Sequence, residues 1–385
     1  MRIALGMIIR SLNSDDVLLT FVNNAEKYGH KLDCIIVAYS QELDNGVAGR
    51  INSRVPFYAI DIKDPRYCAE RLRDIGVTDE AAKTLLECPV DPAGGPVPYG
   101  YKRTVLTTEA ILRGIDVLFF VDSDVHPSIL KRTPDGAVIE DADFFGAHLE
   151  HLNSGSQITT GEYSGYNILP PAVFDGMDDL LFGLQKDDML DYWRGSDSHR
   201  CLATQSEIRE PKPCTKILGG NCAITLSAFS ALPPFFSSFY TINDELFLNR
   251  GEDTVLGLGI AKHNVICTDI GLNPLHDTYK SFPAEPDLRG NPVDQERFFY
   301  ACTGWVGRNP LYNYVRGAEM QSARYDRRDR LERGLRALAE YTHNTRFIGV
   351  LNNFDTSWDN LERYIDEYER VMNAWAQFIK RSDLT

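Results

Sequence analysis

The chain has 385 residues, of which 43% are hydrophobic and 25% are charged, and its formal net charge is −15. This composition is typical of a globular protein with a substantial core and excludes wholesale disorder. The negative charge argues against a nucleic-acid partner, because neutralising phosphates requires a basic surface. No apolar run approaches the roughly 18 residues that a membrane-spanning helix needs.

The eight cysteines are widely scattered and form no C-x-x-C pair. In a chain of this size the pattern favours reduced core residues over a disulfide framework. The opening stretch MRIALGMIIRSLN has only a short apolar run and no small-residue cleavage site after it. We therefore interpret it as a first strand rather than a signal peptide, and we expect a cytoplasmic protein without an integral membrane segment.

Strands and helices alternate through the first third of the chain. Strand-like apolar runs occur at residues 3–9, 32–39, 55–62 and 117–121. Helical patterns follow Ser14 and cover residues 69–87 and 102–114. This order predicts an α/β fold with a mostly parallel sheet, helices on both faces, and a site at the carboxyl ends of the strands.

The second half of the chain is less regular. Residues 142–149 and 219–226 have strand-like patterns, and a long segment rich in Gly, Asp and Tyr lies between them. From about residue 317 onward the pattern is almost purely helical. The arginine-dense stretch 324–336 is interleaved with acidic residues, which favours an ion-paired helix face over a docking surface for a partner.

Two aspartates follow the buried run that ends at Val121, in the sequence VLFFVDSDVHP. A second Asp-x-Asp triplet, Asp141–Asp143, precedes the strand expected at 142–149 and would lie at the opposite edge of the sheet. Asp122 and Asp124 would lie at the carboxyl edge, where open α/β sheets bind ligands. Carboxylates there suit a divalent cation that also contacts phosphate, although a solvated loop explains the pair equally well.

Two further stretches bear on this choice. In NRGEDTVLGLGIAKHN, Glu252 and Asp253 begin an apolar-periodic helix, where acidic residues are also simply favoured by the helix dipole. In GLNPLHDTY, His276 follows a short strand within residues 264–271, and a lone histidine is more often a packed residue than a ligand. Taken singly, neither stretch indicates a site.

Taken in order, these stretches resemble the glycosyltransferases of the GT-A fold, close to family 2-like and polypeptide-GalNAc-transferase-like enzymes. The resemblance covers about residues 1–280 and rests on the sequence of D-S-D, GGN, GED and HD motifs. It implies a catalytic domain at 1–285, with a nucleotide-binding half at about 1–127 and an acceptor half at about 128–285. A mainly helical region would follow at 286–385.

The resemblance also implies roles for individual residues. Asp124 and His276, with Asp122, would hold Mn²⁺ or Mg²⁺, and Asp253 or Glu252 would be the catalytic base. The nucleotide-sugar contacts would come from Arg10, Ser11, Lys102, Arg103, Asp122, Ser123, Gly219, Gly220 and Asn221. The stretch AYSQELDNG replaces the acidic DDGS of many family 2 members, so the nucleotide base stays open.

The expected activity is metal-dependent transfer of a sugar from a UDP- or GDP-sugar to an acceptor hydroxyl, with inversion favoured. Tyr163, Tyr166, Tyr192 and Trp193 would suit a carbohydrate, a polyol or another small acceptor, or would pack the domain junction. A sugar nucleotidyltransferase ranks second, because such enzymes usually carry a glycine-rich loop after the first strand. A non-catalytic nucleotide- or sugar-binding protein is the third alternative.

Overall fold

The structure is a computed structural model that describes residues 1–64, 66–91, 95–134, 136–190, 202–205, 210–318, 321–382 and 384. The strands are β1 (Ile3–Ile9), β2 (Cys34–Tyr39), β3 (Phe57–Asp61), β4 (Val117–Val121), β5 (Val125–Thr133), β6 (Gly136–Asp141), β7 (Ile158–Thr160), β8 (Gly165–Tyr166), β9 (Leu202–Ala203), β10 (Lys212–Pro213), β11 (Asn221–Thr225), β12 (Phe239–Ile242), β13 (Glu245–Leu248), β14 (Cys267–Asp269) and β15 (Pro274–His276).

The α-helices are α1 (Asp16–Lys27), α2 (Asn45–Asn52), α3 (Arg66–Asp74), α4 (Asp79–Leu86), α5 (Tyr99–Leu112), α6 (Phe144–Asn153), α7 (Met177–Gly183), α9 (Glu252–His263), α10 (Pro292–Arg316), α11 (Gln321–Thr342), α12 (Val350–Asp359) and α13 (Leu361–Arg381). Short 3₁₀ helices are η1 (Asp187–Met189), η2 (Leu226–Ser230) and η3 (Thr345–Gly349).

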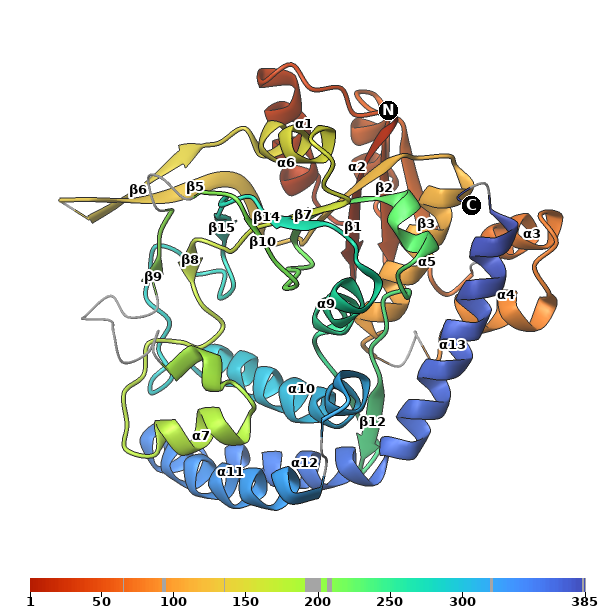
Figure 1. Ribbon diagram of the computed structural model, residues 1–385. Coiled ribbons are helices and arrows are strands. Elements are labelled where there is room, and N and C mark those ends of the chain that lie inside the picture. The colour runs from red at the N-terminus through yellow and green to blue at the C-terminus, as the bar shows by residue number, and fades with distance from the viewer. Residues whose placement is uncertain are drawn as a thin grey trace.

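A sheet of eight strands forms the centre of the molecule, in the order β10-β14-β7-β11-β4-β1-β2-β3. β4, β1, β2 and β3 are parallel, whereas β11 runs antiparallel to both β4 and β7 (Figure 1). The α/β fold expected from the sequence, with a mostly parallel sheet and a helical C-terminal region, is confirmed. The four strands expected in the first third and the strand at 219–226 are confirmed as β1 to β4 and β11.

Alternate side chains of the strands enter two separate cores. Ile3, Leu5 and Met7 of β1 pack with α1, α2 and α6, while Ala4 and Ile8 pack with helices α3 to α5, α9 and α13 on the other face. Because β1 is buried on both faces, its sequence is continuously apolar rather than alternating. The sheet is thereby fixed between two helical layers (Figure 1).

Two antiparallel pairings determine what lies at the carboxyl edge of β4. Asn221 at the start of β11 pairs with Val121 at the end of β4, which places the Gly219–Gly220 turn beside the aspartates. In a second sheet, β15-β5-β6, His276 pairs with Val125. Segments about 100 and 150 residues downstream therefore return to the same strand end.

The strand expected at 142–149 is wrong, because these residues begin helix α6. Asp143 caps the helix by accepting a hydrogen bond from the Gly146 amide at 2.8 Å, and Phe144, Phe145 and His148 form its buried face. The apolar pair was too short to distinguish a strand from a helix. The Asp141–Asp143 triplet therefore ends β6 and caps α6, and Asp141 pairs with Lys27 at 2.5 Å.

The helix expected at 69–87 is divided into α3 and α4. Gly76, with a φ of +85°, adopts the left-handed conformation that ends a helix, and Thr78 caps α4. The arginine-dense stretch forms ion pairs, as expected. Arg328 binds Asp355 at 2.8 Å, and Arg330 and Arg333 share Asp179 of α7.

The C-terminal helices form a third core with α7 and with strands β12 and β13. The division expected near residue 285 falls in the loop before α10, but elements on both sides of it contribute to this core. α13 then runs back along the helices that cover the central sheet, where Trp375 packs on Phe229 of η2 with ring centroids 5.5 Å apart (Figure 1). Among the described residues, no helix is both long and apolar enough to cross a bilayer.

Close packing of α7 on α11 depends on Gly183 of α7 and Gly334 of α11, and Gly334 offers a stability test. A Cβ at Gly334 would lie 2.3 Å from the Leu180 amide nitrogen, although alanine normally favours a helix interior. We expect Gly334→Ala to lower the free energy of unfolding by about 1–3 kcal/mol, measured by urea denaturation.

The control is Gly49→Ala in α2, where nothing lies within 4 Å of the added carbon. This substitution should raise stability by about 0.5–1 kcal/mol. Equal effects at the two positions would contradict the packing assigned to Gly334.

Candidate active site

The site begins where β4 ends. The imidazole Nε2 of His276 lies 3.2 Å from Oδ1 of Asp124, and both side chains are about one-fifth exposed. The Asp277 amide also donates to the Asp124 carbonyl at 2.9 Å, so the backbone holds the two segments together. The sequence-predicted pair, 152 positions apart, is therefore brought together at the carboxyl edge of the sheet.

The histidine ring is oriented by its surroundings. Its Nδ1 lies 3.1 Å from the Thr278 hydroxyl, and its amide donates to the Ser164 carbonyl at 2.9 Å. The Tyr163 ring packs against it, with centroids 4.4 Å apart. A neighbour that occupies one ring nitrogen fixes the ring and directs the other nitrogen, here toward Asp124.

A cationic side chain that the sequence analysis did not predict also reaches this point. The Arg297 guanidinium, from α10, lies 3.7 Å from Oδ2 of Asp124. Burial opposes ionisation of Asp124, but the hydrogen bond and charge of His276, together with Arg297, outweigh it and lower the pKa of that carboxyl. Asp124 is thus held as a carboxylate, the form in which it can bind a cation.

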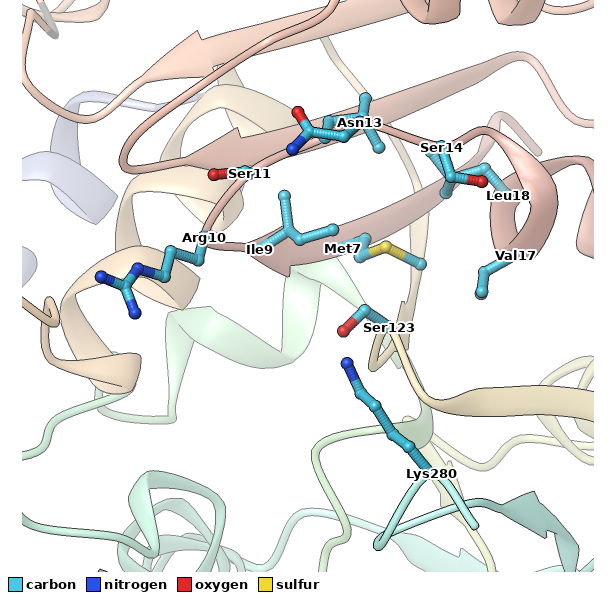
Figure 2. Close-up of a pocket in the computed structure, with 11 residues that line it drawn as sticks. Met7, Ile9, Arg10, Ser11, Asn13, Ser14, Val17, Leu18, Ser123 and Lys280 are labelled. Atoms are coloured by element: carbon cyan, nitrogen blue, oxygen red, sulfur yellow. The ribbon is translucent and has the colours of Figure 1, made fainter. Parts of the chain in front are cut away.

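A cavity of about 420 Å³ opens beside Asp124, between the end of β1 and the start of α1. Arg10, Ser11 and Ser123 line it, as expected, with apolar side chains that include Leu12 and Val17 (Figure 2). Lys280 reaches toward Ser123 from the opposite wall (Figure 2). Its φ of +54° is left-handed, a conformation that costs a residue with a side chain about 1 kcal/mol or more and often marks a functional position.

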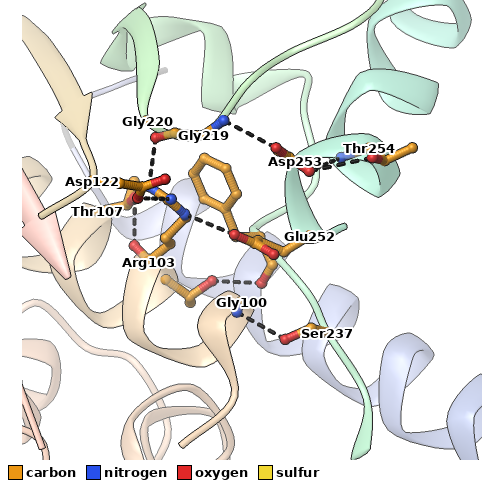
Figure 3. Close-up of polar contacts among 12 residues, drawn as sticks. Gly100, Arg103, Thr107, Asp122, Gly219, Gly220, Ser237, Glu252, Asp253 and Thr254 are labelled. Carbon is orange, nitrogen blue, oxygen red and sulfur yellow. Dashed lines mark hydrogen bonds and ion pairs between the residues drawn. The ribbon is translucent and has the colours of Figure 1, made fainter. Parts of the chain in front are cut away.

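Arg103 forms the centre of a buried network (Figure 3). Its guanidinium donates to Asp122 Oδ1 at 2.8 Å, to the Gly219 carbonyl at 2.8 Å and to Glu252 Oε1 at 2.9 Å. Only 3% of its side chain is exposed. Arg103 therefore ties α5, the end of β4, the glycine turn and the start of α9 together, and none of its hydrogen-bonding groups lines the cavity.

The two acidic residues of α9 differ in environment. Burial, followed by the charge of Asp253, raises the pKa of Glu252, whose carboxylate is bound by Arg103. Asp253 is partly exposed and accepts a hydrogen bond from the Gly219 amide at 3.0 Å. Of the two candidates for a base, Asp253 is the one that contacts the glycine turn and is partly exposed.

The glycine turn is shaped by its protein neighbours. A Cβ at Gly219 would lie 2.6 Å from the Arg103 guanidinium, and one at Gly220 would lie 2.5 Å from Asp122 Oδ2. Asn221 is fully buried and uses its amide on His148, Glu162 and Leu272. Asn221 therefore lies behind the wall of the site, and we omit it from the proposed donor contacts.

The other predicted residues lie apart from the cavity. Lys102 is buried over the Tyr99 ring, 5.1 Å from its centroid, and burial lowers its pKa to about 8. Asp122 is directed to Arg103 rather than to Asp124 and His276. Among the described residues, no group of three or more His, Cys, Asp or Glu side chains converges as a metal site. Tyr192 and Trp193 lie outside the described residues.

Comparisons with known proteins were made on this basis. No known family profile matches the sequence, and neither does any curated protein. Among solved structures, glucosyl-3-phosphoglycerate synthase from Mycobacterium tuberculosis in complex with Mn²⁺ and UDP-glucose is similar, with 13% identity, a TM-score of 0.39, and coverage of 83% of this chain and 80% of that chain.

Two further solved structures have the same degree of similarity. The complex of that synthase with phosphoglyceric acid has 13% identity, a TM-score of 0.38, and coverage of 83% and 81%. A mycobacterial protein has 12% identity, a TM-score of 0.38, and coverage of 83% and 76%. At these identities and TM-scores, none of the three structures assigns an activity to this chain.

The Arg103 network predicts a large stability effect. Arg103→Met leaves the buried Glu252 without its partner, which should lower the free energy of unfolding by about 3–5 kcal/mol. The double variant Arg103→Met/Glu252→Gln should recover part of this loss, because the unpaired buried charge is removed. Urea denaturation of the wild type, Arg103→Met, Glu252→Gln and the double variant measures the coupling.

The matched control is Arg66→Met, which breaks an exposed pair with Asp64. Its effect should stay below about 0.5 kcal/mol. A comparably small effect at Arg103 would show that the network does not hold the site together.

Proposed function

We propose that this chain is a metal-dependent glycosyltransferase that moves a sugar from a nucleoside-diphosphate sugar to an acceptor hydroxyl. The observation that carries the proposal is the convergence of Asp124 and His276 at the carboxyl edge of β4, 3.2 Å apart, beside a cavity large enough for a nucleoside. A solvated loop requires no such convergence. A carboxylate and an imidazole on a rigid strand end form a pair of ligands for a divalent cation.

Asp124 and His276 are the residues that would hold the metal. The mixed oxygen and nitrogen donors favour Mn²⁺ over Mg²⁺, which prefers oxygen ligands alone. With two protein ligands, the remaining positions are left for phosphate oxygens and water. When bound, the cation supplies Lewis-acid stabilisation of the negative charge that develops on the diphosphate leaving group.

The cavity accounts for donor binding. Apolar residues such as Leu12 and Val17 suit a nucleobase, and Arg10, Ser11 and Ser123 supply polar contacts. Lys280 reaches across the opening, and Arg297 lies beside Asp124. Both can therefore neutralise phosphate charge as the diphosphate leaves the sugar. Arg103 acts through Asp122 and the glycine turn, as a positioning residue for the site.

Asp253 is the proposed base. Its carboxylate faces the glycine turn that borders Asp122, and it is more accessible than Glu252. A carboxylate there can accept the proton of an attacking acceptor hydroxyl. Direct attack by that hydroxyl on the anomeric carbon inverts its configuration, and we propose this stereochemical course.

The metal site is tested by thermal denaturation with UDP or GDP, in the presence and absence of Mn²⁺. We expect one nucleotide and Mn²⁺ together to raise the melting temperature, because ligands that bind only the folded state stabilise it. Asp124→Ala should abolish this shift, and His276→Ala should weaken the Mn²⁺ dependence at least about tenfold.

The second Asp-x-Asp triplet provides the matched control. Asp141→Ala removes an aspartate at the end of β6 that pairs with Lys27 of α1. It should leave the metal-dependent shift unchanged. A full response in Asp124→Ala would rule out the proposed metal ligand.

The catalytic role of Asp253 is tested by Asp253→Asn. This variant should keep its nucleotide- and Mn²⁺-dependent thermal shift but lose transfer by about 10²- to 10⁴-fold, because it lacks the proton acceptor. The measurements are the thermal shift and release of nucleoside diphosphate from a panel of UDP- and GDP-sugars. Undiminished transfer would exclude Asp253 as the base, and donor binding without any turnover in the wild type would favour a non-catalytic binding protein.

A further inference from the structure

A second group of cations lies near Asp253, on the side of the site where the acceptor would bind. Arg308 of α10 is only 8% exposed, and its Nε has no hydrogen-bond partner in the described part of the chain. Its closest polar contact is Asn309 Oδ1 at 3.5 Å. A buried guanidinium is costly unless it is paired, so an unpartnered donor at this depth indicates a missing anion.

The chain makes specific room for this guanidinium. Gly251 adopts a left-handed φ of +87°, and a Cβ there would lie 2.5 Å from Arg308 Cδ and 3.1 Å from its Nη1. Only glycine lets the arginine reach the turn that begins α9. The guanidinium thus lies beside the residue that precedes Glu252 and Asp253.

Lys186 contributes a second positive charge. Its ammonium lies 5.0 Å from the centroid of the Trp305 ring, and Tyr312 lies similarly beside Arg308 at 5.5 Å. Burial, followed by the charge of Arg308, lowers the pKa of Lys186 to about 8. The nearby carboxylates are those of Asp253 and the exposed Asp188, and neither forms an ion pair within 4.0 Å with Lys186 or Arg308 among the described residues.

The position of this group on α10 separates it from the metal side of the site. Arg297 and Arg308 are eleven residues apart on one helix, which corresponds to about three turns and about 16 Å of rise. Residues at this spacing lie on the same helix face. One end of that face therefore meets Asp124, and the other meets the start of α9.

From this arrangement we infer that Arg308 and Lys186 bind an anionic group, a phosphate or a carboxylate, on the acceptor. The identification of the ligand as the acceptor rests on the proposed function, while the anion site itself rests on the unpartnered Nε of the buried Arg308 and on the partly buried Lys186 near it. Aromatic rings beside both cations would contact the adjoining carbon skeleton. The acceptor class is then a hydroxylated small molecule that carries a negative charge, rather than a neutral sugar.

The test is a titration of the full chain with inorganic phosphate at constant ionic strength, followed by thermal denaturation. We expect phosphate to stabilise the wild type, with apparent affinity lowered about tenfold in Lys186→Met and in Arg308→Gln. Lys186→Met serves if the more buried Arg308 variant does not fold. Arg316→Met, an exposed cation in the last turn of the same helix, should bind phosphate as the wild type does. Equal affinity in the wild type and Lys186→Met would overturn the site.

Two further arms separate this site from the donor site. Asp253→Asn should bind phosphate about fivefold more tightly, because a repelling charge beside the cations is removed, and unchanged affinity would place the anion elsewhere. Phosphate should still stabilise the protein when UDP or GDP is saturating with Mn²⁺, and loss of its effect would assign it to the diphosphate position. If Asp124→Ala removes the metal response but phosphate binding persists, the anion site stands independently of the proposed metal.

Discussion

The buried guanidinium of Arg103 is the contact on which the arrangement of the site depends. It joins Asp122, the Gly219 carbonyl and Glu252, and the first and last of these lie more than 100 positions apart in the sequence. A buried cation between two carboxylates is stable only if it is well hydrogen-bonded, and here each of the three guanidinium nitrogens donates a hydrogen bond. The network fixes the start of α9, and with it the direction of Asp253. The reactive side chains can therefore stay partly exposed while their supports are buried.

The topology explains why the site lies where it does. β11 runs against its neighbours, so its first residue meets the last residue of β4, and β15 returns to pair with β5 immediately after Asp124. Both pairings bring loops to one edge of the sheet without placing them on its covered faces. Backbone hydrogen bonds then hold His276 opposite Asp124 in the absence of any ligand. Such preorganisation would reduce the entropy lost on binding of the proposed metal and diphosphate.

The sequence predicted those parts of this arrangement that follow from local pattern. Buried strands and their carboxyl ends were readable, which placed Ser123 and Asp124 at the edge of the sheet, whereas the pairing of Asp124 with His276 was predicted from the resemblance to GT-A glycosyltransferases. α6 was missed because Phe144 and Phe145 are compatible with either period. Arg103, Gly219 and Asn221 were noticed, but their partners are tertiary, so their inward direction could not be known from spacing. Arg297 and Arg308 left no signal, since nothing local distinguishes them from other helical arginines.

The return of α13 to the core around the central sheet has a consequence for how the protein is made. Trp375 and Phe378 complete the same core that contains β1, β2 and β4, the first strands to be synthesised. Those strands leave the ribosome more than 200 residues before α13, the last of the helices that cover this face. Nascent chains therefore carry an uncovered apolar surface for most of translation, which makes this half of the molecule a natural client for chaperones during synthesis.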